Sequence, residues 1–164
     1  MPQLSLNTLN NSAALTMAAA LLATLLWPTA RADAERFTAT NPTWKTECGS
    51  CHVPYPPALL PAASWRAIMT DLNQHFGTDA SLEPQVAAEI TAFLVPHAGR
   101  DRGSAHGQPM LRITETAWFK HEHEEELPAA IWSHPAVKSP ANCGACHTRA
   151  ADGDYSEATR RAPH

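Results

Sequence analysis

The chain has 164 residues, 14 of them prolines, and carries 12 basic against 16 acidic side chains, a net charge of −4 with histidine neutral. This length allows one folded domain or at most two, and the acidic balance argues against a nucleic-acid-binding protein. A net charge this small does not identify a protein partner.

Residues 1–34 have the features of a secretory signal peptide. An apolar stretch from Ala13 to Trp27 is too short to span a bilayer comfortably. It is followed by a proline and by two overlapping Ala-x-Ala sequences that end at Ala34, which is the pattern of a cleavage site. No lysine or arginine precedes the apolar stretch, so an uncleaved anchor is the alternative. We predict an exported domain of residues 35–164.

Two short motifs of the same form lie near the two ends of this domain, at residues 48–52 (Cys-Gly-Ser-Cys-His) and 143–147 (Cys-Gly-Ala-Cys-His). The pattern C-x-x-C-H is the attachment site of a c-type haem. Its two cysteines can bond the two vinyl groups of one porphyrin, and the histidine can coordinate the iron. The predicted attachment residues are Cys48 and Cys51 for the first haem and Cys143 and Cys146 for the second.

Other chemistry is open to four cysteines. A four-cysteine zinc site and a dithiol or disulfide pair are the two alternatives. However, all four cysteines of the chain belong to the two motifs, and a histidine follows each pair directly. Covalent haem attachment in bacteria takes place outside the inner membrane, so the motifs and the signal peptide agree on a periplasmic protein.

Three α-helices are predicted between the motifs from apolar residues spaced three and four apart. A capping residue or a proline marks the start of each. The predicted helices are 65–76, capped by Ser64 and ended by Gly77; 83–95, with Pro84 in its first turn; and 115–127, capped by Thr114. A short fourth helix, opened by Ser139-Pro140, is expected to lead into the second motif.

The remaining segments are predicted to be irregular. Asn41-Pro42 is interpreted as a turn, and four prolines between Pro54 and Pro61 favour an extended strap across the first haem, with a plain surface loop as the alternative. Residues 97–109 are expected to form a flexible loop, and the polar tail after His147 is expected to fray. The sequence therefore predicts an all-α, cytochrome c-type domain of short helices and long loops packed around two covalent haems.

The group that fills the sixth coordination position of each iron decides the chemistry. A protein ligand at this position is typical of an electron carrier, whereas an open position is typical of a gas-binding protein or an enzyme. His52 and His147 supply the proximal ligands, which leaves seven other histidines. For the first haem we favour His75, which lies beside the apolar face of a predicted helix. Met69 on the same helix fits better as a core residue.

For the second haem, His121 and His123 compete. They lie two residues apart on a predicted helix, about 200° around its axis, so they cannot both face one porphyrin. His123 lines up with Phe119 and Leu127 in an apolar row and is favoured; His121 is the alternative. Arg112 is a candidate partner for a haem propionate.

Together with His-Phe-Gly at 75–77, Arg-Ile-Thr at 112–114 and Trp-Phe at 118–119, the two motifs resemble the small periplasmic dihaem cytochrome c family of proteobacteria over nearly all of residues 44–150. The resemblance implies a mostly helical domain with two closely spaced, low-spin haems, each held by two histidines. It implies proximal His52 and His147 and distal His75 and His123. The extra His121 departs from the family pattern.

The resemblance also implies a function. Family members resemble electron carriers placed between a membrane b-type cytochrome and a soluble, oxygen-binding monohaem cytochrome c. The expected reaction is reversible one-electron cycling of each iron, with no substrate bond made or broken. The rival hypothesis is a haem enzyme of the peroxidase or reductase type, with one displaceable axial ligand.

Overall fold

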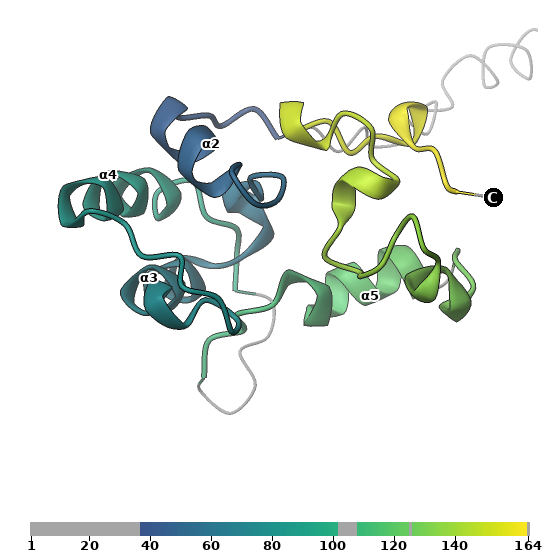
Figure 1. Ribbon diagram of the computed structural model, residues 1–164, viewed down its shortest axis with the longest axis horizontal. Helices are drawn as coiled ribbons and strands as arrows, with labels where there is room; N and C mark the ends of the chain where they lie inside the picture. The colour runs from purple at the N-terminus through teal and green to yellow at the C-terminus, as the bar shows by residue number, and fades with distance from the viewer. Residues whose placement is uncertain (1–36, 102–107, 125, 164) are drawn as a thin grey trace, which may run out of the picture. The chain divides into compact units, whose positions relative to one another are not determined.

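The computed structural model describes residues 37–101, 108–124 and 126–163; the predicted signal peptide, 1–34, lies outside them. The chain within these ranges forms four α-helices joined by 3₁₀ turns and irregular segments, with isolated β-bridges but no strand. The helices are α2 (Pro42–Cys48), α3 (Ala62–Thr70), α4 (Pro84–Leu94) and α5 (Ala117–Glu124) (Figure 1). The prediction of an all-α domain is confirmed. None of the described helices is long and apolar enough to cross a bilayer.

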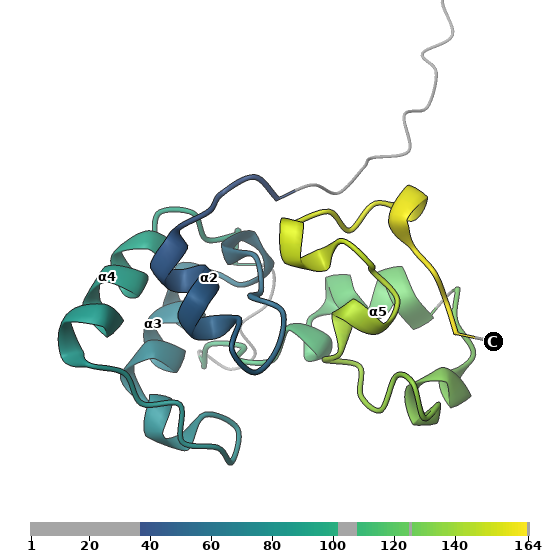
Figure 2. The same cartoon turned by 45° about the horizontal axis from the view of Figure 1, so that its top comes forward.

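Helices α2, α3 and α4 lie side by side in both ribbon views (Figure 1, Figure 2) and enclose a hydrophobic core. The Trp65 indole, which is 7% exposed, donates from Nε1 to the Pro57 carbonyl oxygen at 2.7 Å. This bond satisfies a donor that would otherwise be costly to bury. Burial of each large side chain contributes about 1.5–3 kcal/mol. The buried members of this core are Trp44, Leu60, Trp65, Ile90 and Leu94.

The segment before the first motif is helical, so its interpretation as a turn was wrong. The Asn41 side chain accepts a hydrogen bond from the Trp44 amide at 2.8 Å and caps α2. Pro42 occupies the first helical position, where the amide that proline lacks would have no partner. Since α2 ends at Cys48, a helix that is anchored in the core through Trp44 presents the first cysteine.

Helix α3 is shorter at its C-terminal end than predicted and begins earlier. It starts at Ala62 after Pro61, so Ser64 is a buried residue of the first turn and not the cap. It ends at Thr70, and the chain continues through a 3₁₀ turn, Leu72–Gln74. Threonine, aspartate and asparagine at positions 70–73 are weak helix formers, which accounts for the early end. His75 therefore lies on a turn and not on a helix.

Helix α4 agrees with its prediction, with Pro84 in the first turn. Helix α5, Ala117–Glu124, is shorter than the predicted 115–127. It begins later because the Thr116 hydroxyl, and not that of Thr114, accepts the hydrogen bond from the Phe119 amide at 3.1 Å. Thr114 lies in the preceding 3₁₀ turn, Ile113–Glu115.

The segments around the second motif differ from their predictions. No α-helix begins at Ser139-Pro140, because Lys138 adopts a left-handed conformation with φ 66° and the chain turns there. The motif itself lies on a 3₁₀ turn, Cys143–Ala145. Between the motifs, Pro56 and Pro57 are fully buried, so the proline-rich segment is not a plain surface loop. Residues 102–107 of the predicted flexible loop lie outside the described residues.

The tail after His147 is ordered over its described residues, so the prediction that it frays was wrong. The Phe37 amide donates to the Gly153 carbonyl oxygen at 2.8 Å. Gly153 has φ 75°, and a Cβ at this position would collide with the Phe37 carbonyl oxygen, so only glycine fits. The buried Asp154 carboxylate accepts from the Ser156 hydroxyl at 2.6 Å, and Arg160 pairs with Glu126. Because these contacts involve polar side chains and backbone groups, they produce no apolar periodicity from which the ordered tail could have been predicted.

Candidate metal centres

The first candidate centre brings His75 to the first C-x-x-C-H motif. The His52 ring is oriented by its Nδ1, which lies 2.7 Å from the Val53 carbonyl oxygen, so that Nε2 is the nitrogen left for a metal. The His75 ring faces the His52 ring with centroids 6.3 Å apart and planes 19° apart.

The second candidate centre brings α5 to the second motif. The His123 and His147 rings have centroids 6.2 Å apart, and their planes are inclined by 72°. His123 Nδ1 lies 2.9 Å from the Phe119 carbonyl oxygen, and its ring stacks on Phe119 at 4.1 Å. His121, the competing histidine, is exposed.

Both separations fit one metal ion held between two imidazoles. A metal–nitrogen bond of about 2 Å, plus about 1 Å from that nitrogen to the ring centroid, gives about 6 Å for the whole imidazole–metal–imidazole unit. The measured 6.3 and 6.2 Å match this length. The residues present therefore fit an iron at each of the two places, which would be held by His52 with His75 and by His147 with His123.

The electrostatics of the facing rings also suit metal binding. Burial, and secondarily the neighbouring His52, lowers the pKa of His75. Burial, followed by His123 and Arg160, lowers the pKa of His147. A lowered pKa keeps an imidazole neutral at neutral pH, which is the form that binds metals.

None of the four cysteines forms a disulfide, so all four are available for haem attachment. Burial raises the pKa of Cys48 and of Cys143 to about 11, whereas Cys51 is exposed. Among the described residues, no three cysteine, histidine or acidic side chains lie close enough together to hold a metal. The alternative of a four-cysteine zinc site therefore has no support in the geometry.

Tyr55 connects the two centres and was not identified from the sequence. Its ring stacks on His52 with centroids 4.4 Å apart and planes 15° apart. Its hydroxyl donates to the Ala141 carbonyl oxygen at 2.6 Å, two residues before Cys143. Burial, followed by the charge of Cys143, raises its pKa to about 12, so the phenol stays protonated. The signal available in the sequence was a tyrosine three residues after the first motif.

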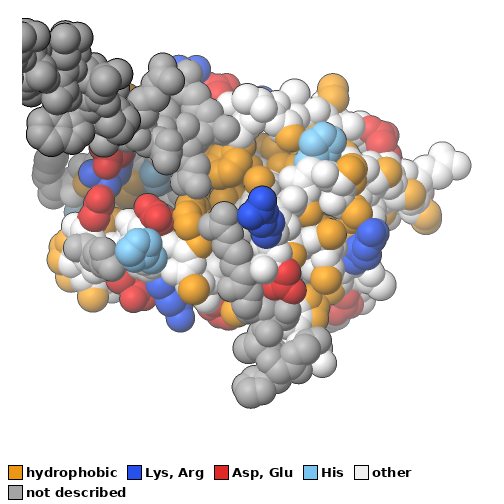
Figure 3. All heavy atoms as spheres, turned by 180° about the vertical axis from the view of Figure 1, so that it is seen from behind, with side chains coloured by type: hydrophobic (Ala, Val, Ile, Leu, Met, Phe, Trp, Pro, Cys, Tyr) orange, Lys and Arg blue, Asp and Glu red, His pale blue; other side chains and the backbone are white. Residues whose placement is uncertain are grey.

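Other aromatic side chains complete the surroundings. Tyr155 lies 5.1 Å from His147, centroid to centroid, and Trp132 lies 6.0 Å from His123. Arg112, the predicted propionate partner, places its guanidinium 4.4 Å from the Phe76 ring centroid, beside the turn that carries His75. Hydrophobic side chains also reach the surface among charged ones on the face shown in Figure 3. The role of Arg112 toward a propionate stays a prediction.

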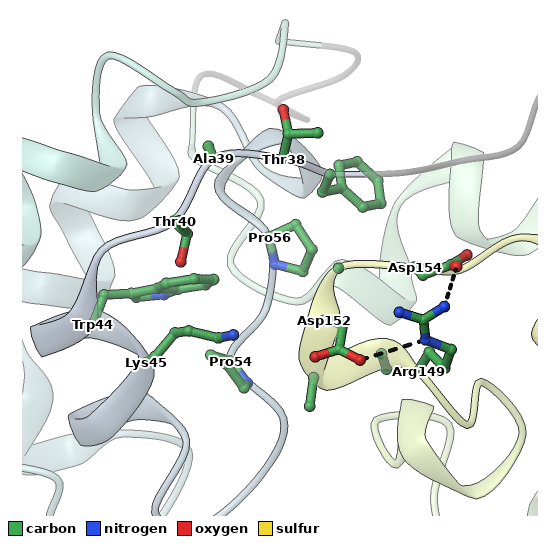
Figure 4. A pocket seen from close by; sticks show the side chains of 14 residues that line it. Thr38, Ala39, Thr40, Trp44, Lys45, Pro54, Pro56, Arg149, Asp152 and Asp154 are labelled. Carbon is green, nitrogen blue, oxygen red and sulfur yellow. Dashed lines mark hydrogen bonds and ion pairs between the residues drawn. The ribbon is translucent and has the colours of Figure 1, made fainter.

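A pocket lies between the first described residues, α2 and the turns of the C-terminal segment (Figure 4). It is lined by residues 37–40 and 149–154 together with side chains of α2 and the proline-rich segment, and none of the four histidines contributes to it. Arg149 on its wall pairs with Asp152 at 3.4 Å and with Asp154 at 3.7 Å. These pairs join the turns of the C-terminal segment.

Comparison with known proteins agrees with this geometry. Residues 44–155 match the family model described as dihaem cytochrome c. The chain is similar to a solved structure of the diheme cytochrome c from Rhodobacter sphaeroides, with 41% identity, a TM-score of 0.66, and coverage of 73% of this chain and 99% of that one. It is similar to a diheme cytochrome c from Shewanella baltica OS155, with 42% identity, a TM-score of 0.65, and coverage of 75% and 93%. No curated protein matches the chain.

Fold and motifs together define a c-type cytochrome. The chain belongs to the dihaem cytochrome c family, and it therefore carries two covalently attached haems and is an electron-transfer cytochrome. The expectations of family, fold and cofactor are confirmed.

Proposed function

We propose that this chain is a periplasmic one-electron carrier, exported by a signal peptide at residues 1–34. In it, His52 and His75 coordinate the first iron, and His147 and His123 coordinate the second. The observation that carries the proposal is the pair of ring separations, 6.3 and 6.2 Å, each of which accommodates one iron. When bound, each haem supplies a reversible change between Fe(III) and Fe(II).

The protein's own residues supply orientation and electrostatics. Hydrogen bonds from Nδ1 of His52 and of His123 to backbone carbonyls hold these rings in place and increase the basicity of the coordinating nitrogen. Because imidazoles face each other at both centres, the ligand geometry changes little between oxidation states. The haem-enzyme alternative requires a position open to substrate, and two facing histidines at each centre favour the carrier.

Tyr55 supports transfer within one molecule. Its stack on His52 and its hydrogen bond to Ala141 form a continuous contact from the first proximal ligand to the second attachment segment. We propose that electrons pass internally along this side of the centres. The proposed external partners are a membrane b-type cytochrome and a soluble monohaem cytochrome c. Glu122 and Glu124, exposed on α5, offer an acidic surface to a basic partner.

The test of the ligand set compares His123→Ala with His121→Ala. Loss of a true axial ligand converts one haem from low spin to high spin, which the oxidised absorption and electron paramagnetic resonance spectra report. We expect His123→Ala to convert one of the two haems and His121→Ala to leave both low-spin. The opposite pattern would assign His121 to the second iron.

The carrier function itself is tested by redox titration of the purified protein. We expect two reversible one-electron steps, with both haems low-spin in each oxidation state. A haem that is high-spin in the unmodified protein would contradict the proposal. The mass of the mature protein, with two haems and a chain beginning at residue 35, tests the predicted cleavage site.

A further inference from the structure

The two distal histidines are held by different kinds of backbone. His123 lies within α5, and the Leu127 amide donates to its carbonyl oxygen at 3.0 Å. His75 follows the 3₁₀ turn Leu72–Gln74 and belongs to no α-helix. Regular helical hydrogen bonds therefore fix His123, while a single turn positions His75.

The two imidazoles also differ in their hydrogen bonds. His123 Nδ1 is paired with the Phe119 carbonyl oxygen at 2.9 Å. Such a bond fixes the ring and strengthens the opposite nitrogen as a ligand. Within the described part of the chain, the His75 ring makes no hydrogen bond, and its ring contacts are with His52 and Phe76. The bond from His75 to a metal lacks this support.

Packing separates the two ligands further. The His123 ring stacks on Phe119, which is 7% exposed. The His75 ring meets Phe76 edge-on at 4.9 Å, and Phe76 is 45% exposed. None of residues 71–80 is buried, so displacement of this segment costs little apolar burial.

The segment 72–80 is a loop closed by its own backbone. The Ala80 amide donates to the Leu72 carbonyl oxygen at 2.9 Å, and the Thr78 amide to that of His75 at 3.0 Å. Inside the loop, Phe76 has φ 50° and Gly77 has φ 94°. The left-handed conformation is strained for a bulky residue such as Phe76. Opening of the loop would break these two backbone hydrogen bonds and release this strain, and no residue of 72–80 belongs to the hydrophobic core.

We propose that the first haem centre is a binding site for small neutral diatomic molecules, which replace His75 at the iron when the loop 72–80 opens, whereas the second centre retains His123. This inference rests on the ligand pairs of the proposed function. It is a ligand exchange, in which the bond from iron to His75 breaks, a bond to the diatomic molecule forms, and no electron is gained or lost.

The charges around the loop favour a neutral ligand. Asp71, directly before the loop, and Asp79 within it are exposed and repel anions. The cation beside Phe76, Arg112, is compensated by Glu115 at 3.5 Å. Carbon monoxide, which binds reduced iron, is therefore the appropriate probe.

The experiment is a carbon monoxide titration of the reduced holoprotein, followed by its visible spectrum, for the wild type, His75→Ala and His123→Ala. We expect one haem per chain to react in the wild type, one in His75→Ala and both in His123→Ala. If the second haem were the reactive one, His75→Ala would react at both haems and His123→Ala at one, and the proposal would be overturned.

Two further outcomes are distinct from each other. A wild type in which neither haem reacts overturns the inference and leaves the carrier function intact. A haem that is high-spin in the wild type before carbon monoxide is added shows instead that a ligand pair of the proposed function is wrong. Far-UV circular dichroism of each variant establishes that it is folded.

A second variant pair tests the role of the loop without removing a ligand. A Cβ at Gly77 would meet no atom within 4 Å, so Gly77→Ala adds only backbone strain at φ 94°. We expect apparent carbon monoxide binding to become roughly tenfold tighter, from the cost of the left-handed conformation. The matched control is Thr78→Ala, at an exposed neighbour with ordinary φ, which should leave binding unchanged. Equal affinities of Gly77→Ala and wild type would contradict control by loop opening.

Discussion

The two halves of the described chain hold their metal centres by different means. In the first half, α2, α3 and α4 enclose a cluster of five buried hydrophobic residues. From residue 108 onward, the buried hydrophobic residues among those described are Phe119, Val137 and Ala150, and α5 is accompanied by 3₁₀ turns. The first half therefore has a core of its own, whereas the second depends on what its histidines and cysteines bind.

The half with the larger core has the less firmly held distal histidine, and the half with the smaller core has the more firmly held one. The half with the core carries His75 on an exposed turn, and the half without one carries His123 on a helix with a hydrogen-bonded ring. A packed core stabilises the first half without help from the haem, so the segment that carries its distal histidine can be flexible. The second half has a smaller core and depends on contacts with its haem, so its distal histidine has to be held rigidly.

The largest effect that would sharpen this comparison comes from removing one haem at a time. We expect Cys143→Ala with Cys146→Ala to abolish hydrogen-exchange protection throughout the second half, because three buried hydrophobic residues cannot offset its chain entropy. The corresponding change of Cys48 and Cys51 should leave amides of α3 and α4 protected. Hydrogen exchange read by mass spectrometry checks both, and a protected second half without its haem would break the comparison.

A smaller effect is expected from the contact that joins the halves. Tyr55→Phe keeps the stack on His52 but removes the hydrogen bond to Ala141, and should lower the free energy of unfolding by about 0.5–1.5 kcal/mol. Urea unfolding followed by haem absorption measures this loss. Thr70→Val is the matched control, since its hydroxyl also bonds a carbonyl oxygen at 2.6 Å, but within α3. We expect the two haems to unfold in separate urea transitions in Tyr55→Phe but together in Thr70→Val. If the transitions of the two haems coincided equally well in both variants, Tyr55 would not join the halves.

The smallest effect concerns an exposed ion pair in the second half. Arg160 lowers the pKa of Glu126 through a hydrogen bond and its charge. A carboxyl whose pKa is lower in the folded state adds stability above its unfolded pKa and loses it as the pH falls through the folded pKa. We expect Glu126→Gln to lower Tm slightly at pH 7 and low salt, and this difference to shrink as the pH falls through the lowered pKa of Glu126. Glu122→Gln on α5 is the control, and a difference that persists at low pH would exclude the pair as its cause.

Much of this arrangement could be predicted because its signals are local. The two C-x-x-C-H motifs mark both attachment sites, and Pro84 and Pro96 bracket α4. Helix α2 was missed because Asn41-Pro42 suits a turn as well as a capped helix, and only the packing of Trp44 decides between them.

Long-range contacts account for the remaining differences. The apolar spacing that favoured His75 continues through Leu72 and Phe76, although α3 ends at Thr70, so His75 faces His52 from a turn that periodicity did not indicate. The contact from Tyr55 to Ala141 and the pairing of Phe37 with Gly153 join residues 86 and 116 positions apart (153 − 37 = 116). No sequence window contains both partners of such a contact.

The pairing of Phe37 with Gly153 has a kinetic consequence. One of the first described residues closes against one of the last turns, reinforced by the edge-on contact of Phe37 with Tyr155 at 5.5 Å. Contacts this distant in sequence form late, because the loop between them has to close first. Both attachment segments, 48–52 and 143–147, lie within this loop and take no part in the closure. The cysteines can therefore receive their haems from an open chain, and the closure then completes the fold around them.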